Sequence, residues 1–272
     1  MKLLLVVQAR LGSSRLPGKV LLPLAGEPAL VRMLERVRAA KSPFQLAVAT
    51  TDLPEDKPIV DLCVERGIEV FCGHPLDVLD RHYQAAIHYN ADAVIKIPSD
   101  CPLIDPAAID RVLQYFLAHL GEYDFVTNLL PPTWPDGNDV EVMTRSALTS
   151  AWQEAERPFE REHTTPFIWE NSGRFRVSNV TWETGHNYAQ SHRFVLDYVE
   201  DYQFISAVFD RLLPALGPAF SLEQILDLLG RAPELQDINR KHLGSCWQQN
   251  HLHELKTFGP PNGPLNWVSG SP

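Results

Sequence analysis

Short apolar runs alternate with amphipathic segments along most of the chain. The first run, residues 3–7 (LLLVV), is too short for a helix and is typical of a strand buried on both faces. Apolar residues at helical spacing follow several of the runs, so the pattern predicts an α/β fold with a single Rossmann-like, mostly parallel sheet and crossover helices. Further strands are expected at residues 45–50, 69–71, 93–97, 124–127, 139–143 and 193–196.

Capping residues mark where helices begin. Asp77 and Asp105 each stand just before an apolar stripe and are expected to cap the helices that follow them. In the helix expected from Pro28 onward, Arg32, Arg36 and Arg38 lie off the apolar stripe. We therefore expect these three arginines to be solvated.

Composition bounds the domain organisation and the class of partner. With 272 residues, 44% of them hydrophobic, the chain can bury one large core, expected over residues 1–255, and residues 256–272 are expected to form a Pro/Gly-rich tail. A net charge of −10 argues against nucleic acid as a partner, and no apolar stretch reaches the roughly 18 residues that membrane insertion needs. Four cysteines without C-x-x-C spacing indicate reduced thiols and a cytoplasmic location.

The loop after the first strand, residues 8–19, concentrates small and cationic side chains. Its small residues let backbone amides approach a ligand, and Arg10, Arg15 and Lys19 can neutralise a polyanion. It is not a Walker A loop, because five residues separate its two glycines and a valine follows Lys19. The composition favours a phosphate-binding loop of another kind, and the alternative is an ordinary loop with solvated cations.

The string Q-A-R-x-x-S-x-R-x-P-G-K at residues 8–19 resembles the N-terminal signature of the sugar-acid cytidylyltransferases. From residue 1 to about residue 239, the chain is most similar to the SpsF-like branch of that family. The resemblance implies a fold of the nucleotide-diphospho-sugar transferase type, with residues 1–255 as a nucleotidyltransferase domain. It also implies a CTP-dependent enzyme that activates a sugar acid of the 3-deoxy-2-ulosonate type to a CMP-sugar, with release of pyrophosphate, for surface polysaccharide synthesis. A homodimer is usual among the similar enzymes.

The same resemblance implies roles for individual residues. Arg10, Lys19 and Asp100 are expected to be catalytic. Asp52, after the second strand, is expected beside the nucleotide base, and the alternative is that it only caps a turn. The residues expected to bind the nucleotide are Ala9, Arg10, Gly12, Ser13, Ser14, Arg15, Lys19, Asp52 and Arg81.

Two acidic stretches resemble metal-binding elements of the family. Residues 98–103 (PSDCPL) resemble G-D-x-P-L, with Ser99 where glycine is usual, and residues 197–201 (DYVED) resemble D-x-x-E-D. In open α/β sheets, ligands bind at the carboxyl ends of the strands, where both Asp100 and Asp197 are expected. Two hard oxygen ligands suit Mg²⁺, so the expected cofactor is Mg²⁺ held by these two aspartates.

The sugar is expected to contact the second half of the chain. Residues 139–143 resemble the family's P-x-G-x-D-V-E-V element, with Asn138 where an apolar residue is usual, and residues 161–166 match its R-E-H-x-T-P string. The alternative for this region is a salt-bridged helix surface. The residues expected to hold sugar hydroxyls are Asp139, Glu141, Glu162 and His163.

Two other functions fit parts of the sequence. A glycosyltransferase could use a ready-made nucleotide sugar on the same fold, but neither Asp100 nor Asp197 belongs to the D-x-D motif that such enzymes commonly carry. That absence, together with the cationic loop, favours nucleotidyl transfer. A non-catalytic nucleotide- or sugar-binding protein would account for the departures at Ser99 and Asn138.

Overall fold

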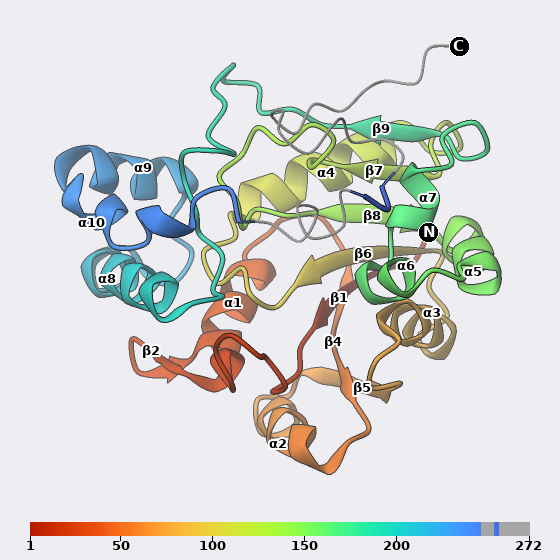
Figure 1. Cartoon of the computed structure of the whole chain (residues 1–272), viewed down its shortest axis with the longest axis horizontal. Coiled ribbons are helices and arrows are strands. Elements are labelled where there is room, and N and C mark those ends of the chain that lie inside the picture. Colours follow the sequence, from red (N-terminus) through yellow and green to blue (C-terminus); the bar gives the residue numbers. More distant parts are fainter. Residues whose placement is uncertain (246–252, 256–272) are drawn as a thin grey trace.

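A seven-stranded sheet runs through the centre of the molecule (Figure 1). The computed structural model describes residues 1–245 and 253–255, so the expected tail at residues 256–272 lies outside the described residues. All strands run in one direction except β8, and the mostly parallel α/β fold is thereby confirmed. In spatial order the strands are β5 (Glu69–Gly73), β4 (Gln45–Thr51), β1 (Leu3–Gln8), β6 (Ala93–Pro98), β8 (Glu141–Thr144), β7 (Phe125–Thr127) and β9 (Val177–Asn179).

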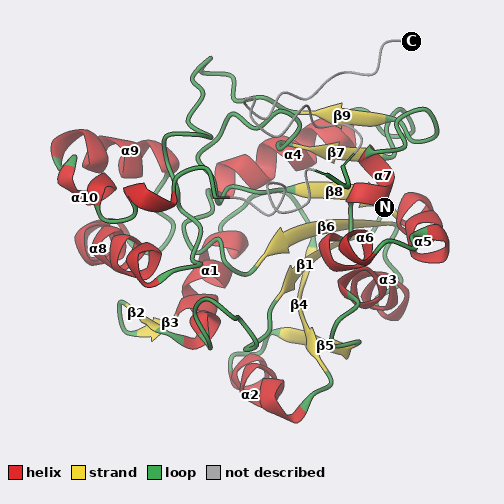
Figure 2. Cartoon of the chain, in the orientation of Figure 1, coloured by secondary structure: helices red, strands yellow, loops and turns green. Residues whose placement is uncertain are grey.

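The central strand β1 has apolar side chains on both faces because helices cover both sides of the sheet (Figure 2). Leu5 belongs to a core cluster with α1, α2 and α4, whereas Leu4 belongs to the opposite cluster with α3, α5, α6 and α7. The bounds of these helices are α1 (Ala29–Arg38), α2 (Lys57–Glu65), α3 (Val78–His88), α4 (Pro106–Ala118), α5 (Arg145–Glu154), α6 (Pro158–His163) and α7 (Pro166–Trp169).

The last three helices form a third cluster, seen together on the left of Figure 1 in teal and blue. They are α8 (Val199–Leu216), α9 (Leu222–Arg231) and α10 (Glu234–Asp237), and they pack with Leu24 of a small ribbon made by β2 (Pro23–Leu24) and β3 (Glu27–Pro28). We call these three helices the helical lobe. Within residues 1–245 and 253–255, none of the helices combines the length and the apolar character needed to cross a membrane. The short 3₁₀ helices are η1 (Lys19–Leu21), η2 (Pro54–Asp56) and η3 (Arg240–His242).

The two capping predictions are confirmed. Asp77 Oδ1 accepts the N–H of Asp80 at 2.8 Å, and Asp105 Oδ1 accepts the N–H of Ala107 at 3.4 Å. Both carboxylates satisfy backbone donors in the first turn of a helix. They therefore have a structural role at these positions.

Arg36 on α1 is buried, so the expectation that it is solvated is wrong. Its side chain is 0% exposed. Nε donates to the carbonyl of Ile104 at 2.9 Å, Nη1 donates to the carbonyl of Pro218 at 2.7 Å, and the guanidinium lies 4.2 Å from the ring centroid of Phe220. The segment between α8 and α9, which contains Pro218 and Phe220, packs on this face of α1. The periodicity of α1 alone does not reveal that another segment packs there.

Residues 193–196 do not form a strand, so that prediction is also wrong. The segment makes one isolated parallel bridge, between Arg193 and Asp136 in the Pro-rich loop at residues 128–139. Gly137 allows this close approach, because a Cβ at that position would lie 2.8 Å from the carbonyl carbon of Phe194. The loop, rather than the sheet, therefore positions the segment that leads to Asp197.

Candidate functional site

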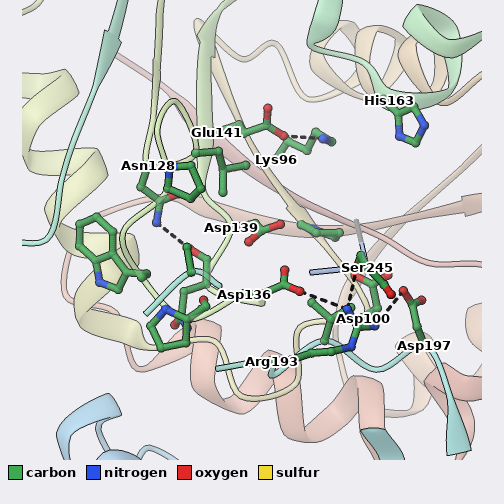
Figure 3. Close-up of a pocket in the computed structure, with 18 of the residues that line it drawn as sticks. Lys96, Asp100, Asn128, Asp136, Asp139, Glu141, His163, Arg193, Asp197 and Ser245 are labelled. Carbon is green, nitrogen blue, oxygen red and sulfur yellow. Dashed lines mark hydrogen bonds and ion pairs between the residues drawn. The ribbon is translucent and has the colours of Figure 1, made fainter. Parts of the chain in front are cut away.

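Two adjoining pockets open where β1 and β6 end. The loop pocket, about 420 Å³, is lined by Gly12, Ser13, Ser14 and Lys19, and the inner pocket, about 410 Å³, extends to the 128–139 loop and β8 (Figure 3). Because they share lining residues, they form one crevice. The shared residues are Gln8, Arg10, Arg15, Pro98, Asp100, Glu162, His163 and Asp197.

The crevice brings Lys19, Asp100 and Asp197 into direct contact. Lys19 Nζ lies 3.0 Å from Asp100 Oδ2 and 2.8 Å from Asp197 Oδ1. Arg15 Nη2 lies 2.7 Å from the other oxygen, Asp197 Oδ2. The two expected metal ligands thus meet at a single ammonium group, although 97 positions separate them in the sequence.

A main-chain bond explains why these two aspartates meet. The N–H of Leu196 donates to the carbonyl oxygen of Asp100 at 2.7 Å. This bond places Asp197, the residue after Leu196, beside the end of β6. Asp197 therefore reaches the carboxyl edge of the sheet as expected, but from an extended segment and not from a strand.

Electrostatic interactions within this cluster keep Lys19 and Asp197 in their charged forms. Burial on its own would lower the pKa of Lys19, but Asp100 and Asp197 raise it above its usual value. Burial would likewise raise the pKa of Asp197, but Lys19 and Arg15 hold it below its usual value. Lys19 and Asp197 therefore both stay ionised around neutral pH.

The donor set fits a divalent cation that also binds phosphate. Within residues 1–245 and 253–255, no group of three or more His, Cys, Asp or Glu side chains is arranged to hold a metal ion. Asp100 and Asp197 are nevertheless two hard oxygen donors that already converge on one positive charge. Mg²⁺ is commonly held by one or two carboxylates plus phosphates and water, so the residues present suit it.

The loop at residues 8–19 has the features of an anion-binding loop. Within the described part of the chain, the N–H groups of Gly12 and Ser14 have no hydrogen-bond acceptor, and Arg10 is exposed and lines both pockets. Gly18 has a φ of +68°, a conformation that side chains disfavour. Ala9 differs from the other expected ligands: it is buried and its N–H donates to the carbonyl of Ala49 at 3.0 Å.

Asp52 and Arg81 lie outside both pockets. Asp52 is exposed and its N–H donates to the carbonyl of Gly73 at 3.1 Å. Arg81 is buried, and its Nη2 donates to Gln8 Oε1 at 3.3 Å. Burial and the neighbouring Arg10 lower the pKa of Arg81 to about 10. Arg81 therefore contacts the crevice through Gln8, which lines both pockets.

All four residues expected to bind the sugar line the inner pocket. Glu141 contacts Lys96 and accepts the hydroxyl of Thr165 at 2.6 Å, which links β8 to the segment at residues 161–166. Salt bridges, the alternative for this region, are present as well: Glu141 pairs with Lys96, and Arg161 Nε donates to Asp77 at 2.8 Å. The structure brings Asp139, Glu141, Glu162 and His163 together, and their binding of sugar stays a prediction.

Asparagine in place of Asp139 is expected to stabilise the metal-free protein. Burial, then Asp100 and Glu141, raise the pKa of Asp139 to about 7, against about 3.9 in an unfolded chain. The folded state therefore binds the extra proton, and the wild type loses stability as the pH rises from about 4 to about 7. The Tm of Asp139→Asn should therefore exceed that of the wild type by an amount that grows over this pH range. The difference should reach about 2 °C or more by about pH 8.

Thermal melts at a series of pH values check this prediction. Asp61→Asn is the control, because Asp61 is exposed on α2 and paired with Lys57. The control should show no gain that grows with pH. An Asp139→Asn protein less stable than the wild type at about pH 8 would contradict the assignment of a destabilising charge.

Sequence reasoning missed several residues that line the inner pocket. Lys96 had a usable signal, since it is the one charged residue in the buried run at residues 93–97 (AVIKI). No sequence signal marked Asp136 or Arg193, because their contact at 3.2 Å joins two loops that are 57 positions apart in the sequence. Figure 3 shows Arg193 between Asp136 and Asp197.

Comparison with known proteins finds relatives over most of the chain. Residues 4–242 match the family model for cytidylyltransferases. The spore coat polysaccharide biosynthesis protein SpsF of Bacillus subtilis (strain 168) is 30% identical over 239 residues, covering 85% of this chain and 95% of that protein. A solved cytidylyltransferase structure from Leptospira borgpetersenii matches with a TM-score of 0.81 and 31% identity, covering 86% of this chain and 96% of its own.

A third relative is similar over a shorter region. The 8-amino-3,8-dideoxy-manno-octulosonate cytidylyltransferase of Shewanella frigidimarina is 36% identical over 132 residues. These residues make up 47% of this chain and 52% of that protein.

Proposed function

The chain belongs to the cytidylyltransferase family, and on that premise we propose that it transfers the cytidylyl group of CTP to a sugar acid of the 3-deoxy-2-ulosonate type, with release of pyrophosphate. The family makes it a nucleotidyltransferase, and the resemblance to the SpsF-like branch is confirmed. The name of the Shewanella relative supports a sugar acid as acceptor, and that of SpsF supports a role in surface polysaccharide synthesis. The cytoplasmic location and the homodimer stay predictions.

One observation carries this proposal: cations of the loop at residues 8–19 contact the pair Asp100 and Asp197 in a crevice that continues into a second pocket. The loop pocket suits the triphosphate, since Arg10, Arg15 and the free amides of the loop can neutralise and hold it. The inner pocket, with hydrogen-bonding groups on β8 and α6, suits a polyhydroxylated acceptor.

Positioning and charge neutralisation are what this site contributes to the reaction. The anomeric oxygen of the sugar forms a bond to the α-phosphorus while the bond from that phosphorus to the oxygen bridging to the β-phosphate breaks. The bridging oxygen leaves with pyrophosphate, and the hydroxyl proton passes to water. Arg15 and Lys19 lie where negative charge on the departing pyrophosphate can be neutralised. Mg²⁺ bound by Asp100 and Asp197 would polarise the phosphate oxygens as a Lewis acid.

A matrix of nucleotides and sugar acids, each with and without Mg²⁺, tests the proposal. We expect pyrophosphate release only when CTP, a 3-deoxy-2-ulosonate and Mg²⁺ are all present, because each contributes a group to the transition state. Incubation with a UDP-sugar is the parallel arm. UDP release there would favour the glycosyltransferase, and CTP binding that ignores Mg²⁺, with no turnover on any sugar acid, would favour a binding protein.

A further inference from the structure

Arg193 lines the inner pocket but has no donor left for a substrate. Its side chain is 1% exposed. Nε donates to Asp201 at 3.0 Å, and Nη2 donates to Asp201 at 3.1 Å and to Asp197 at 3.4 Å. Nη1 donates to Asp136 at 3.2 Å and to the carbonyl of Ser245 at 2.9 Å. A guanidinium has five N–H donors, and each of these has an acceptor within the protein.

Asp201, the main partner of Arg193, holds the main chain at Asp197. It is 0% exposed and lines neither pocket. Its Oδ2 accepts the N–H of Asp197 at 3.1 Å and the N–H of Tyr198 at 3.0 Å, and its Oδ1 accepts Asn239 Nδ2 at 3.0 Å. Any effect of Asp201 on the reaction must therefore pass through the residues that it holds.

The two oxygens of Asp197 face different partners. Oδ2 faces Arg193 at 3.4 Å and Arg15 at 2.7 Å, whereas Oδ1 faces Lys19, the ammonium that it shares with Asp100. The contacts of Oδ2, together with the main-chain bonds to Asp201, set the direction in which Oδ1 points. This direction decides whether Asp197 and Asp100 can bind the same cation.

The geometry points to Arg193 and Asp201 as positioning residues, which orient the carboxylate of Asp197 toward Asp100 before the substrates bind. This inference rests on the proposed function, in which Asp197 is a ligand of a divalent cation. Arg193 acts on one carboxylate oxygen, and Asp201 acts on the backbone and on Arg193 itself. Loss of either should weaken cation binding without removing any group that touches the cation or CTP.

Binding of Mn²⁺ in the presence of CTP, followed by electron paramagnetic resonance, tests the inference. In the variants Arg193→Lys and Asp201→Asn we expect Mn²⁺ affinity to fall about 10- to 100-fold, the usual cost of losing an outer partner of a metal ligand. The affinity for CTP without metal should change little, because the cations of the loop at residues 8–19 are intact. The kcat should fall with the Mn²⁺ affinity.

Asp110→Asn is the matched control for a structural effect. The carboxylate of Asp110 also accepts main-chain N–H groups, from Lys41 at 2.9 Å and from Ser42 at 2.7 Å, but it lines neither pocket. This control is expected to lower Tm and to leave Mn²⁺ affinity unchanged. An equal loss of Mn²⁺ affinity in the control would overturn the positioning role.

A milder variant covers the case in which the first two proteins fail to fold. Asn239→Ser removes an amide that donates to Asp201 and to the carbonyl of Arg193, both at 3.0 Å. A folded variant of this set with wild-type Mn²⁺ affinity overturns the inference and leaves the proposed function standing. If the wild type itself binds no Mn²⁺ with CTP, the proposed function falls, and the positioning role falls with it.

Discussion

Magnesium-dependent pyrophosphate release is expected to fall by about 1,000-fold or more when asparagine replaces Asp100 or Asp197. Each substitution keeps the size of the side chain but removes a charged oxygen ligand. A bound metal ion contributes several kcal/mol of charge stabilisation, which corresponds to about three orders of magnitude in rate. Initial rates over a series of Mg²⁺ concentrations, with CTP and a sugar acid, measure the effect.

The fold should survive the substitution of Asp100, because its side chain is 27% exposed and contacts one cation. Melting temperature and circular dichroism check this point. Asp61→Asn on α2 is the control, since Asp61 lines neither pocket, and its activity should match the wild type. Full activity in Asp100→Asn would remove Asp100 from the mechanism, whatever the result for Asp197.

Methionine in place of Lys19 is expected to weaken CTP binding and to strengthen the binding of Mn²⁺ alone. In the free protein the ammonium of Lys19 lies between the carboxylates of Asp100 and Asp197, where it competes with a metal cation for the same oxygens. A unit charge about 4 Å from an opposite one contributes on the order of 4 kcal/mol at an effective dielectric near 20. We therefore expect a loss of at least about 100-fold in kcat/KM for CTP and a gain of about 10-fold or more in Mn²⁺ affinity without nucleotide.

Calorimetry with Mn²⁺ alone, with CTP alone and with both separates these two effects. Lys57→Met is the control, because Lys57 is an exposed lysine on α2 that lines neither pocket. In the wild type, metal and CTP should bind cooperatively, since the triphosphate draws Lys19 away from the carboxylates. If Lys19→Met weakens Mn²⁺ binding in the absence of CTP, the ammonium supports the metal site and does not compete with it.

The parallel half of the sheet could be predicted because its strands are continuous apolar runs. Residues 3–7 and 93–97 are buried on both faces, and this requirement leaves a strong pattern in the sequence. The other half was harder to predict. β9 has three residues, Val177–Asn179, all of them half-buried, and so its burial leaves no clear alternation. Its position comes from pairing with β7.

The candidate site could be predicted only where one segment carries several of its groups. The loop at residues 8–19 combines small and cationic residues within one short string, and the structure places Arg10, Arg15 and Lys19 on the crevice. The resemblance to D-x-x-E-D pointed to Asp197, although the reason expected for its position, the end of a strand, was wrong. The isolated bridge between Arg193 and Asp136 shows why, since the apolar pattern of the segment reflects packing against a loop and the helical lobe.

The partners of Arg193 could not be predicted from the sequence at all. Asp136, Asp201 and Ser245 come from three separate segments, and only the folded chain brings them to one guanidinium. Charged residues of this kind look like ordinary surface residues in a sequence. Their burial depends on the helical lobe, whose packing is a tertiary property.

The hydrogen bond from Leu196 to Asp100 joins two main-chain atoms. Every amino acid except proline carries the donor that it needs. The bond itself therefore does not depend on which side chain stands at position 196, although Leu196 is buried in the core and packs there. A single inserted or deleted residue beside it would move one of the two acidic groups out of reach. The main-chain spacing of the cation ligands is thus set by chain length, whereas the direction of the Asp197 carboxylate depends on the side chains of Arg193 and Asp201.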